Sequence, residues 1–79
     1  MNRDFDVEMR YFMGKKGFKN LEKLRRKTDI GSNTTFIQRW KYPETFTAEQ
    51  LDDMFDYLDV PYEKRIEIMG VIWGITLKA

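Results

Sequence analysis

The 79 residues are enough for one small domain, and 15% of them are aromatic, which is more than a disordered chain usually carries. There is no cysteine and no histidine, so disulfide bonds, thiolate metal sites and the commonest catalytic base are excluded. The formal net charge is only +1, but residues 15–41 carry a local charge of +7 and residues 42–67 one of −6. A basic half of this kind suggests nucleic-acid binding.

Two amphipathic helices are predicted in the first part of the chain. Helical spacing of apolar residues predicts one over about 5–16 and another over about 20–28, where Asn20 is a suitable N-cap. The apolar residues are Phe5, Met9, Phe12 and Met13 in the first helix and Leu21 and Leu24 in the second. Lysine and arginine cover most of the rest of the second helix, which makes it basic.

A third helix is predicted to follow a polar turn and to end near Lys41. Either Ser32 or Asn33 can cap its N-terminus. Its inward-facing candidates are Phe36, Ile37 and Trp40. We expect Trp40 in the core and Phe36 packed against it from one turn away, instead of exposed as a wedge against a thymine methyl group.

Two more helices complete the predicted fold. Thr47 and Gln50 form a capping box at the start of the fourth helix, which is apolar at Leu51, Met54, Phe55 and Leu58. Pro61 suits the first position of a fifth helix that runs to about Trp73. The apolar C-terminal segment 66–79 ends in an alternating pattern, so its last residues are either helical or extended. The expected fold class is therefore all-α, a compact bundle of about five helices.

Residues 20–41 have the helix and turn lengths of a helix-turn-helix. The residues that carry a family likeness are Leu21, Leu24 and Ile30, followed by Ile37-Gln38-Arg39-Trp40. Over about residues 18–66 the chain resembles the small Cro and repressor-type (XRE-like) helix-turn-helix domains of phages and bacteria. This resemblance implies a single DNA-binding domain over residues 1–79, a transcriptional regulator whose third helix enters the major groove. The chain departs from the family in its turn, residues 31–36, which is about two residues longer, and at Arg25, where a small residue is usual.

Polar side chains on and around the third helix are the candidate DNA-reading residues. Glutamine suits adenine and arginine suits guanine because each can form two hydrogen bonds to a base edge. The base-contact candidates are Asn33, Thr34, Thr35, Gln38 and Arg39, and the phosphate-contact candidates are Lys19, Asn20, Lys23, Lys41 and Tyr42. Plainer roles stay open: Gln38 and Arg39 can simply solvate a helix face, and Thr34 and Thr35 can be cap and turn residues.

Protein partners are also predicted. Domains of this kind usually bind double-stranded DNA as dimers, and the apolar tail offers a seam for a homodimer or another protein at Ile72, Trp73, Ile75 and Leu77. An alternative function is a protein-binding module, such as a phage antirepressor or small inhibitor that binds a repressor. It would act through an acidic face formed by Asp52, Asp53, Asp56 and Asp59. That face can equally be only solvated, and no metal is expected because an EF-hand pattern is absent.

An enzyme is not expected from this sequence. It has no glycine-rich phosphate loop and no nucleophile-elbow pattern, so no cofactor is predicted. The longest apolar run, residues 68–77, is too short to span a bilayer, and no signal peptide is visible. We therefore expect a cytoplasmic protein with no membrane partner.

Overall fold

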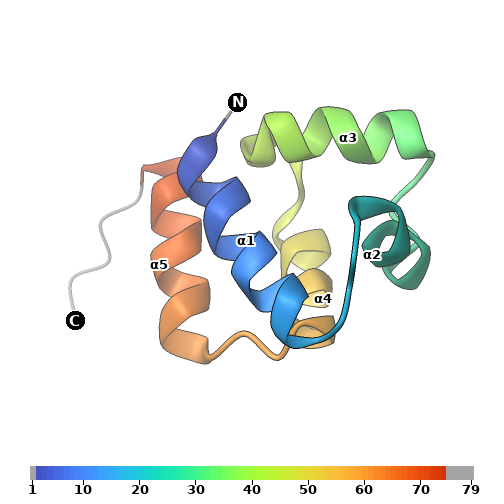
Figure 1. The fold of residues 1–79 in the computed structure, drawn as a ribbon. Coiled ribbons are helices and arrows are strands. Elements are labelled where there is room, and N and C mark those ends of the chain that lie inside the picture. Colours follow the sequence, from blue (N-terminus) through green and yellow to red (C-terminus); the bar gives the residue numbers. More distant parts are fainter. Residues whose placement is uncertain (1, 75–79) are drawn as a thin grey trace.

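The computed structural model describes residues 2–74, and every regular element within them is helical (Figure 1). The elements are α1 (Arg3–Lys15), α2 (Leu21–Thr28), α3 (Asn33–Lys41), the short 3-10 helix η1 (Pro43–Thr45), α4 (Ala48–Tyr57) and α5 (Tyr62–Trp73). The predicted all-α class with five α-helices is confirmed. The question of an extended tail concerns residues that lie outside the described part of the chain.

Side-chain caps explain where four of the helices begin. The predicted cap Asn20 accepts a hydrogen bond from the backbone N–H of Lys23, and the predicted capping box at the start of α4 is complete. Of the two candidates for α3, Ser32 is the cap. The first helix begins two residues earlier than predicted because Asn2 Oδ1 accepts from the N–H of Phe5 at 3.0 Å. Pro61 precedes α5 instead of occupying its first position.

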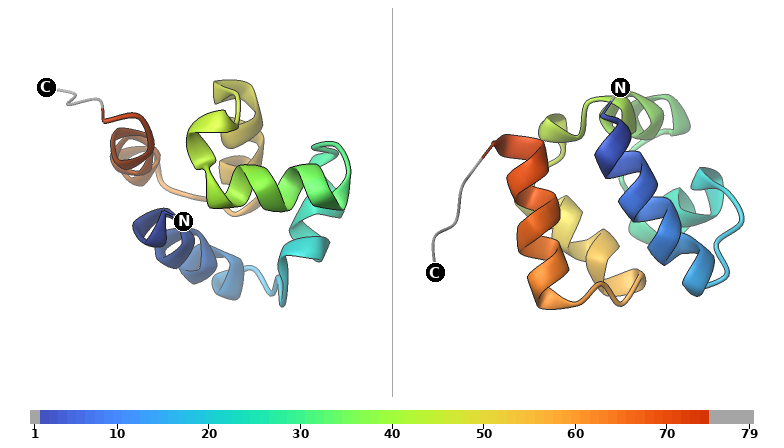
Figure 2. Two further views of the ribbon diagram at one scale, coloured as in Figure 1. Left: turned by 90° about the horizontal axis from the view of Figure 1, so that it is seen from above. Right: turned by 60° about the vertical axis from the view of Figure 1, so that its left-hand side comes forward.

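The five helices surround one hydrophobic core (Figure 2). Helices α1 and α5 lie side by side, α4 packs behind them, and α2 packs against α3 and α4. Helix α3 crosses the end of the bundle, so that one face looks into the core and the other looks outward. This arrangement leaves the polar side of α3 uncovered.

Trp40 joins α3 to α1 at the centre of the core. Its side chain is only 2% exposed, and its ring centroid lies 5.0 Å from that of Phe5 and 5.8 Å from that of Phe36. The indole Nε1–H donates to Asp6 Oδ1 at 2.7 Å, so the one polar atom of the ring is satisfied on burial. The predictions that Trp40 is core and that Phe36 packs against it are confirmed.

The end of α5 contributes to the same core. Ile68 and Ile72 are buried, and Trp73 packs against the core at its edge, where its Nε1–H donates to the carbonyl oxygen of Glu44 at 3.4 Å. The helix ends at Gly74, whose φ of 64° is left-handed. Ile72, one of the predicted seam residues, therefore belongs to the core of its own chain.

Replacing Trp40 by alanine should remove the central contact between α1 and α3. We expect a loss of about 3–5 kcal/mol in the free energy of unfolding, which approaches the whole stability of a small domain. Urea denaturation followed by circular dichroism measures this change. Tyr57→Ala is the control, because Tyr57 is 45% exposed on α4 and its loss should change stability by much less. Nearly equal midpoints for the two variants would contradict the central role of Trp40.

Candidate nucleic-acid interface

A four-residue turn connects α2 to α3. Asp29 and Gly31 have left-handed φ values of 53° and 62°, and between them Ile30 inserts its buried side chain into the core. A turn of this length that contains glycine is typical of a helix-turn-helix. The segment 31–36, which the sequence suggested as a long turn, is mostly the first turn of α3, since that helix begins at Asn33.

Arg25 ties this turn to α2. Its guanidinium forms two hydrogen bonds with the carboxylate of Glu22 and donates from Nη1 to the carbonyl oxygen of Gly31 at 3.3 Å. The bond from Arg25 lowers the pKa of Glu22, partly against the effect of desolvation, and raises the pKa of the guanidinium itself. Arg25 thus bridges α2 and the turn.

The outward face of α3 carries polar side chains and ends at Lys41. Asn33, Thr34 and Gln38 are exposed and make no side-chain hydrogen bond within residues 2–74. Thr34, Gln38 and Lys41 follow one another at helical spacing, opposite the buried Phe36 and Trp40. Of the base-contact candidates, Asn33, Thr34 and Gln38 therefore have the least restricted side chains.

The other two base-contact candidates have structural partners. The N–H of Thr35 donates to Ser32 Oγ, and the hydroxyl of Ser32 donates to Thr35 Oγ1, so Thr35 belongs to the cap of α3. Arg39 is partly buried and donates from Nη1 to the carbonyl oxygen of Thr45, which holds α3 against η1. Thr35 is thus a cap residue, one of the roles left open by the sequence.

The phosphate-contact candidates are all exposed and flank the helix-turn-helix at two places. Lys19, Asn20 and Lys23 lie around the start of α2, where Asn20 also caps the helix, whereas Lys41 and Tyr42 lie at the end of α3. The described structure therefore separates them into two groups, one at each end of the motif.

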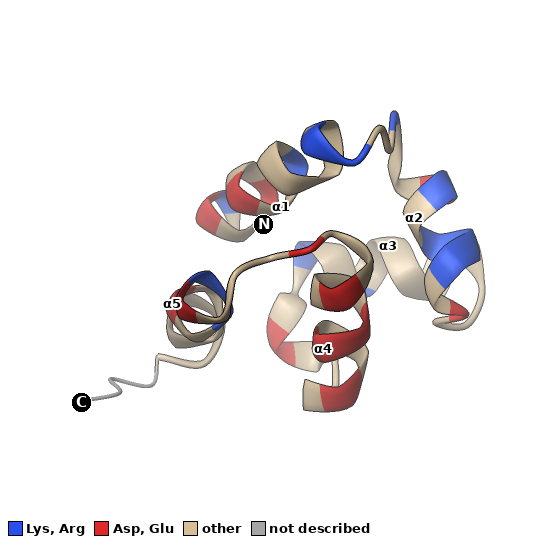
Figure 3. Ribbon diagram, turned by 90° about the horizontal axis from the view of Figure 1, so that it is seen from below, with Lys and Arg blue, Asp and Glu red and all other residues tan. Residues whose placement is uncertain are grey.

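A basic hollow between α1 and α2 was not selected from the sequence. It has a volume of about 500 Å³ and is lined by Lys16, Gly17, Phe18, Lys23, Arg26 and Lys27, with no acidic residue among them. Figure 3 shows lysine and arginine gathered on α2 and the end of α1, whereas aspartate and glutamate mark α4. The run of basic residues on α2 is visible in the sequence. The hollow itself depends on how the end of α1 packs beside α2, which the sequence does not show.

The acidic face of α4 is largely paired within the chain. The guanidinium of Arg65 lies 3.0 Å from Asp52 and 2.8 Å from Asp56, and Asp59 pairs with Lys16. Among the residues that the structure covers, Asp53 is the one member of this face without an ion pair. Internal pairing reduces the negative charge that this face can offer to a partner.

The predicted dimer seam is only partly visible. Ile72 is buried, Trp73 is partly buried against the core, and Ile75 and Leu77 lie outside the described residues.

Comparisons with protein-family models, with curated proteins and with solved structures gave no match. None of the helices in the described residues has the length and apolar character needed to cross a membrane.

The lowered pKa of Glu22 makes a prediction about acid unfolding. Because the folded chain favours the ionised carboxylate, this contribution to stability is present above about pH 5 and is lost as the pH falls through the folded-state pKa. Glu22→Gln should therefore lose less stability between about pH 5 and pH 3 than the wild type does. Urea denaturation across this range measures both slopes.

Glu49→Gln is the matched control for this experiment. Glu49 lies in the first turn of α4 as Glu22 does in the first turn of α2, but it has no ion pair among the described residues. The difference between the two variants therefore isolates the bond to Arg25 from the effect of the helix N-terminus. Identical slopes for Glu22→Gln and the wild type would mean that the bond between Glu22 and Arg25 is not maintained in solution.

Proposed function

We propose that this protein is a sequence-specific DNA-binding transcriptional regulator of the Cro and repressor type, with α3 in the major groove. The observation that carries this proposal is the outward face of α3. Thr34 and Gln38 offer hydrogen-bonding groups that suit base edges, and Lys41 lies on the same side of the helix. The turn before α3 has the length of a helix-turn-helix, and the neighbouring helix α2 is basic.

Charge placement also supports a nucleic-acid ligand. Basic residues line the hollow between α1 and α2, and further lysines flank the motif at Lys19 and Lys41. Lysine and arginine near phosphates release counterions and give affinity that does not depend on sequence. The alternative of a protein-binding module that acts through the acidic face of α4 is less well supported, since Arg65 and Lys16 already pair with most of that face.

A homodimer is part of this proposal. Proteins of this type place two recognition helices on half-sites about one helical turn of DNA apart. Of the predicted seam residues that the structure describes, Trp73 is partly exposed and Ile72 is buried.

Binding to duplex DNA should weaken steeply as salt concentration rises. The logarithm of the binding constant should fall against the logarithm of salt concentration with a slope of about −0.9 for each phosphate neutralised. Fluorescence anisotropy with a mixed-sequence duplex at several salt concentrations measures this slope. Absence of binding at low salt, or binding that salt does not affect, would refute the proposed function.

Gln38 and Lys23 should affect DNA binding in different ways. Gln38→Ala should cost about 1–3 kcal/mol at one base pair and relax the preference there, because its amide faces outward from the centre of α3. Lys23→Ala should weaken all sequences alike and reduce the salt slope by about one phosphate. A selected panel of binding sites measures both effects.

Arg39→Ala serves as a control for the register of α3 on DNA. Because the guanidinium of Arg39 is bonded to Thr45, this variant should change stability and sequence preference together.

One outcome would contradict the different roles of Gln38 and Lys23. If Gln38→Ala and Lys23→Ala behave identically across the panel, Gln38 does not contact a base and α3 does not read the major groove with this face.

A further inference from the structure

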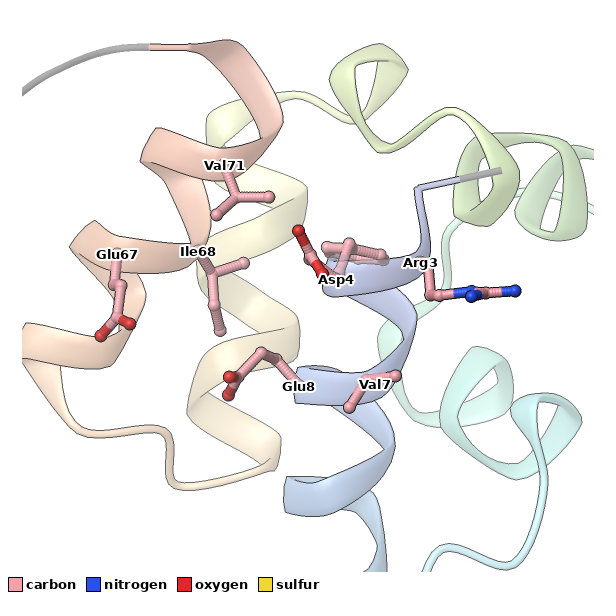
Figure 4. Close-up of a pocket in the computed structure, with 8 residues that line it drawn as sticks. Arg3, Asp4, Val7, Glu8, Glu67, Ile68 and Val71 are labelled. Atoms are coloured by element: carbon pink, nitrogen blue, oxygen red, sulfur yellow. The ribbon is translucent and has the colours of Figure 1, made fainter.

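A groove between α1 and α5 combines an apolar floor with exposed apolar edges (Figure 4). Its volume is about 340 Å³. Phe5 and Ile68 form the floor and belong to the core, whereas Val7 and Val71 line the groove with 58% and 45% of their surface exposed. The hollow therefore has two exposed valines beside a buried apolar floor.

The rim of this groove is acidic. Asp4, Glu8 and Glu67 line it, and Arg3, its single basic lining residue, points away from α5 in Figure 4. Asp4 and Glu8 lie one turn apart on α1, so their like charges repel each other. Neither has an ion pair within residues 2–74, and Glu67 is paired only with the neighbouring Lys64, at 3.3 Å. This rim differs from the acidic face of α4, where three of the four aspartates have an ion-pair partner.

We propose that the groove binds a basic amphipathic helix of a partner protein. Apolar side chains of that helix would cover Val7, Ile68 and Val71, and its lysine or arginine residues would lie beside Asp4 and Glu8. The charge of the rim selects this occupant. A second copy that docked symmetrically would bring the same carboxylates against each other, which is unfavourable.

This site is separate from the proposed DNA-reading surface. The groove follows α1 and α5, whereas the outward side of α3 lies across the end of the bundle (Figures 1 and 2). The proposal therefore does not depend on DNA binding, and each can fail without the other.

Two synthetic peptides test the charge requirement. One carries leucine at positions i, i+3, i+4 and i+7 with lysine elsewhere, and the matched peptide carries glutamate in place of lysine. The full chain is titrated into each labelled peptide, and fluorescence anisotropy gives the dissociation constant. We expect the basic peptide to bind about tenfold or more tightly than the acidic one.

Variants of the chain test the location. Val71→Ser should weaken binding of the basic peptide about fivefold, and the double variant Asp4→Asn, Glu8→Gln should weaken it and reduce its salt dependence. Tyr57→Ser and Glu49→Gln on α4 are the controls. Tyr57 is exposed to the same extent as Val71, and neither control residue lines the groove. Thermal unfolding of each variant checks that it is folded.

Three results would overturn the proposal. The first is equal affinity for the two peptides, and the second is unchanged binding by the folded Val71→Ser variant. The third is a dimer of the full chain that Val71→Ser dissociates in sedimentation, which would make a second copy the occupant.

Discussion

The indole ring of Trp40 lies between Phe5 of α1 and Phe36 of its own helix, and its single N–H is bonded to Asp6. Asp6 also accepts a hydrogen bond from Arg10 at 2.9 Å, so this carboxylate is held from both sides. These contacts fix the rotation of α3 about its axis, because the face that carries Trp40 must look inward. Exposure of Thr34 and Gln38 on the opposite face follows directly from that constraint.

The position of α3 along its axis depends on a second set of contacts at its two ends. At the N-terminal end, Arg25 holds the backbone of Gly31, and Ser32 caps the helix. At the other end, Arg39 donates to the carbonyl oxygen of Thr45 in η1. Arg25 and Arg39 therefore hold the helix-turn-helix in shape. Without these two arginines, the side chains free to contact a ligand are fewer and carry less charge.

Local patterns predicted the helices well because caps and apolar spacing act within a few residues. Asn20, Ser32 and the Thr47 capping box each bond to a residue three positions away. The missed features join distant parts of the chain: Lys16 pairs with Asp59, and Arg65 with Asp52. No local pattern specifies such partners, so the sequence suggested an open acidic face and an unrestrained Arg39. The base-contact candidates were predicted from side-chain chemistry alone. Helix packing leaves Thr34 and Gln38 facing outward, whereas Arg39 is hydrogen-bonded within the chain.

The backbone N–H of Asn2 donates to the carbonyl oxygen of Lys41 at 3.3 Å, which places the start of α1 beside the end of α3 (Figure 1). A fusion partner or affinity tag attached ahead of Asn2 would therefore emerge next to Lys41 and Tyr42. Bulk at that point would crowd any duplex approaching α3, and a polyhistidine tag would add titratable charge there. Surface immobilisation through this end of the chain would shield the same residues, so measurements on tagged and untagged protein are not interchangeable.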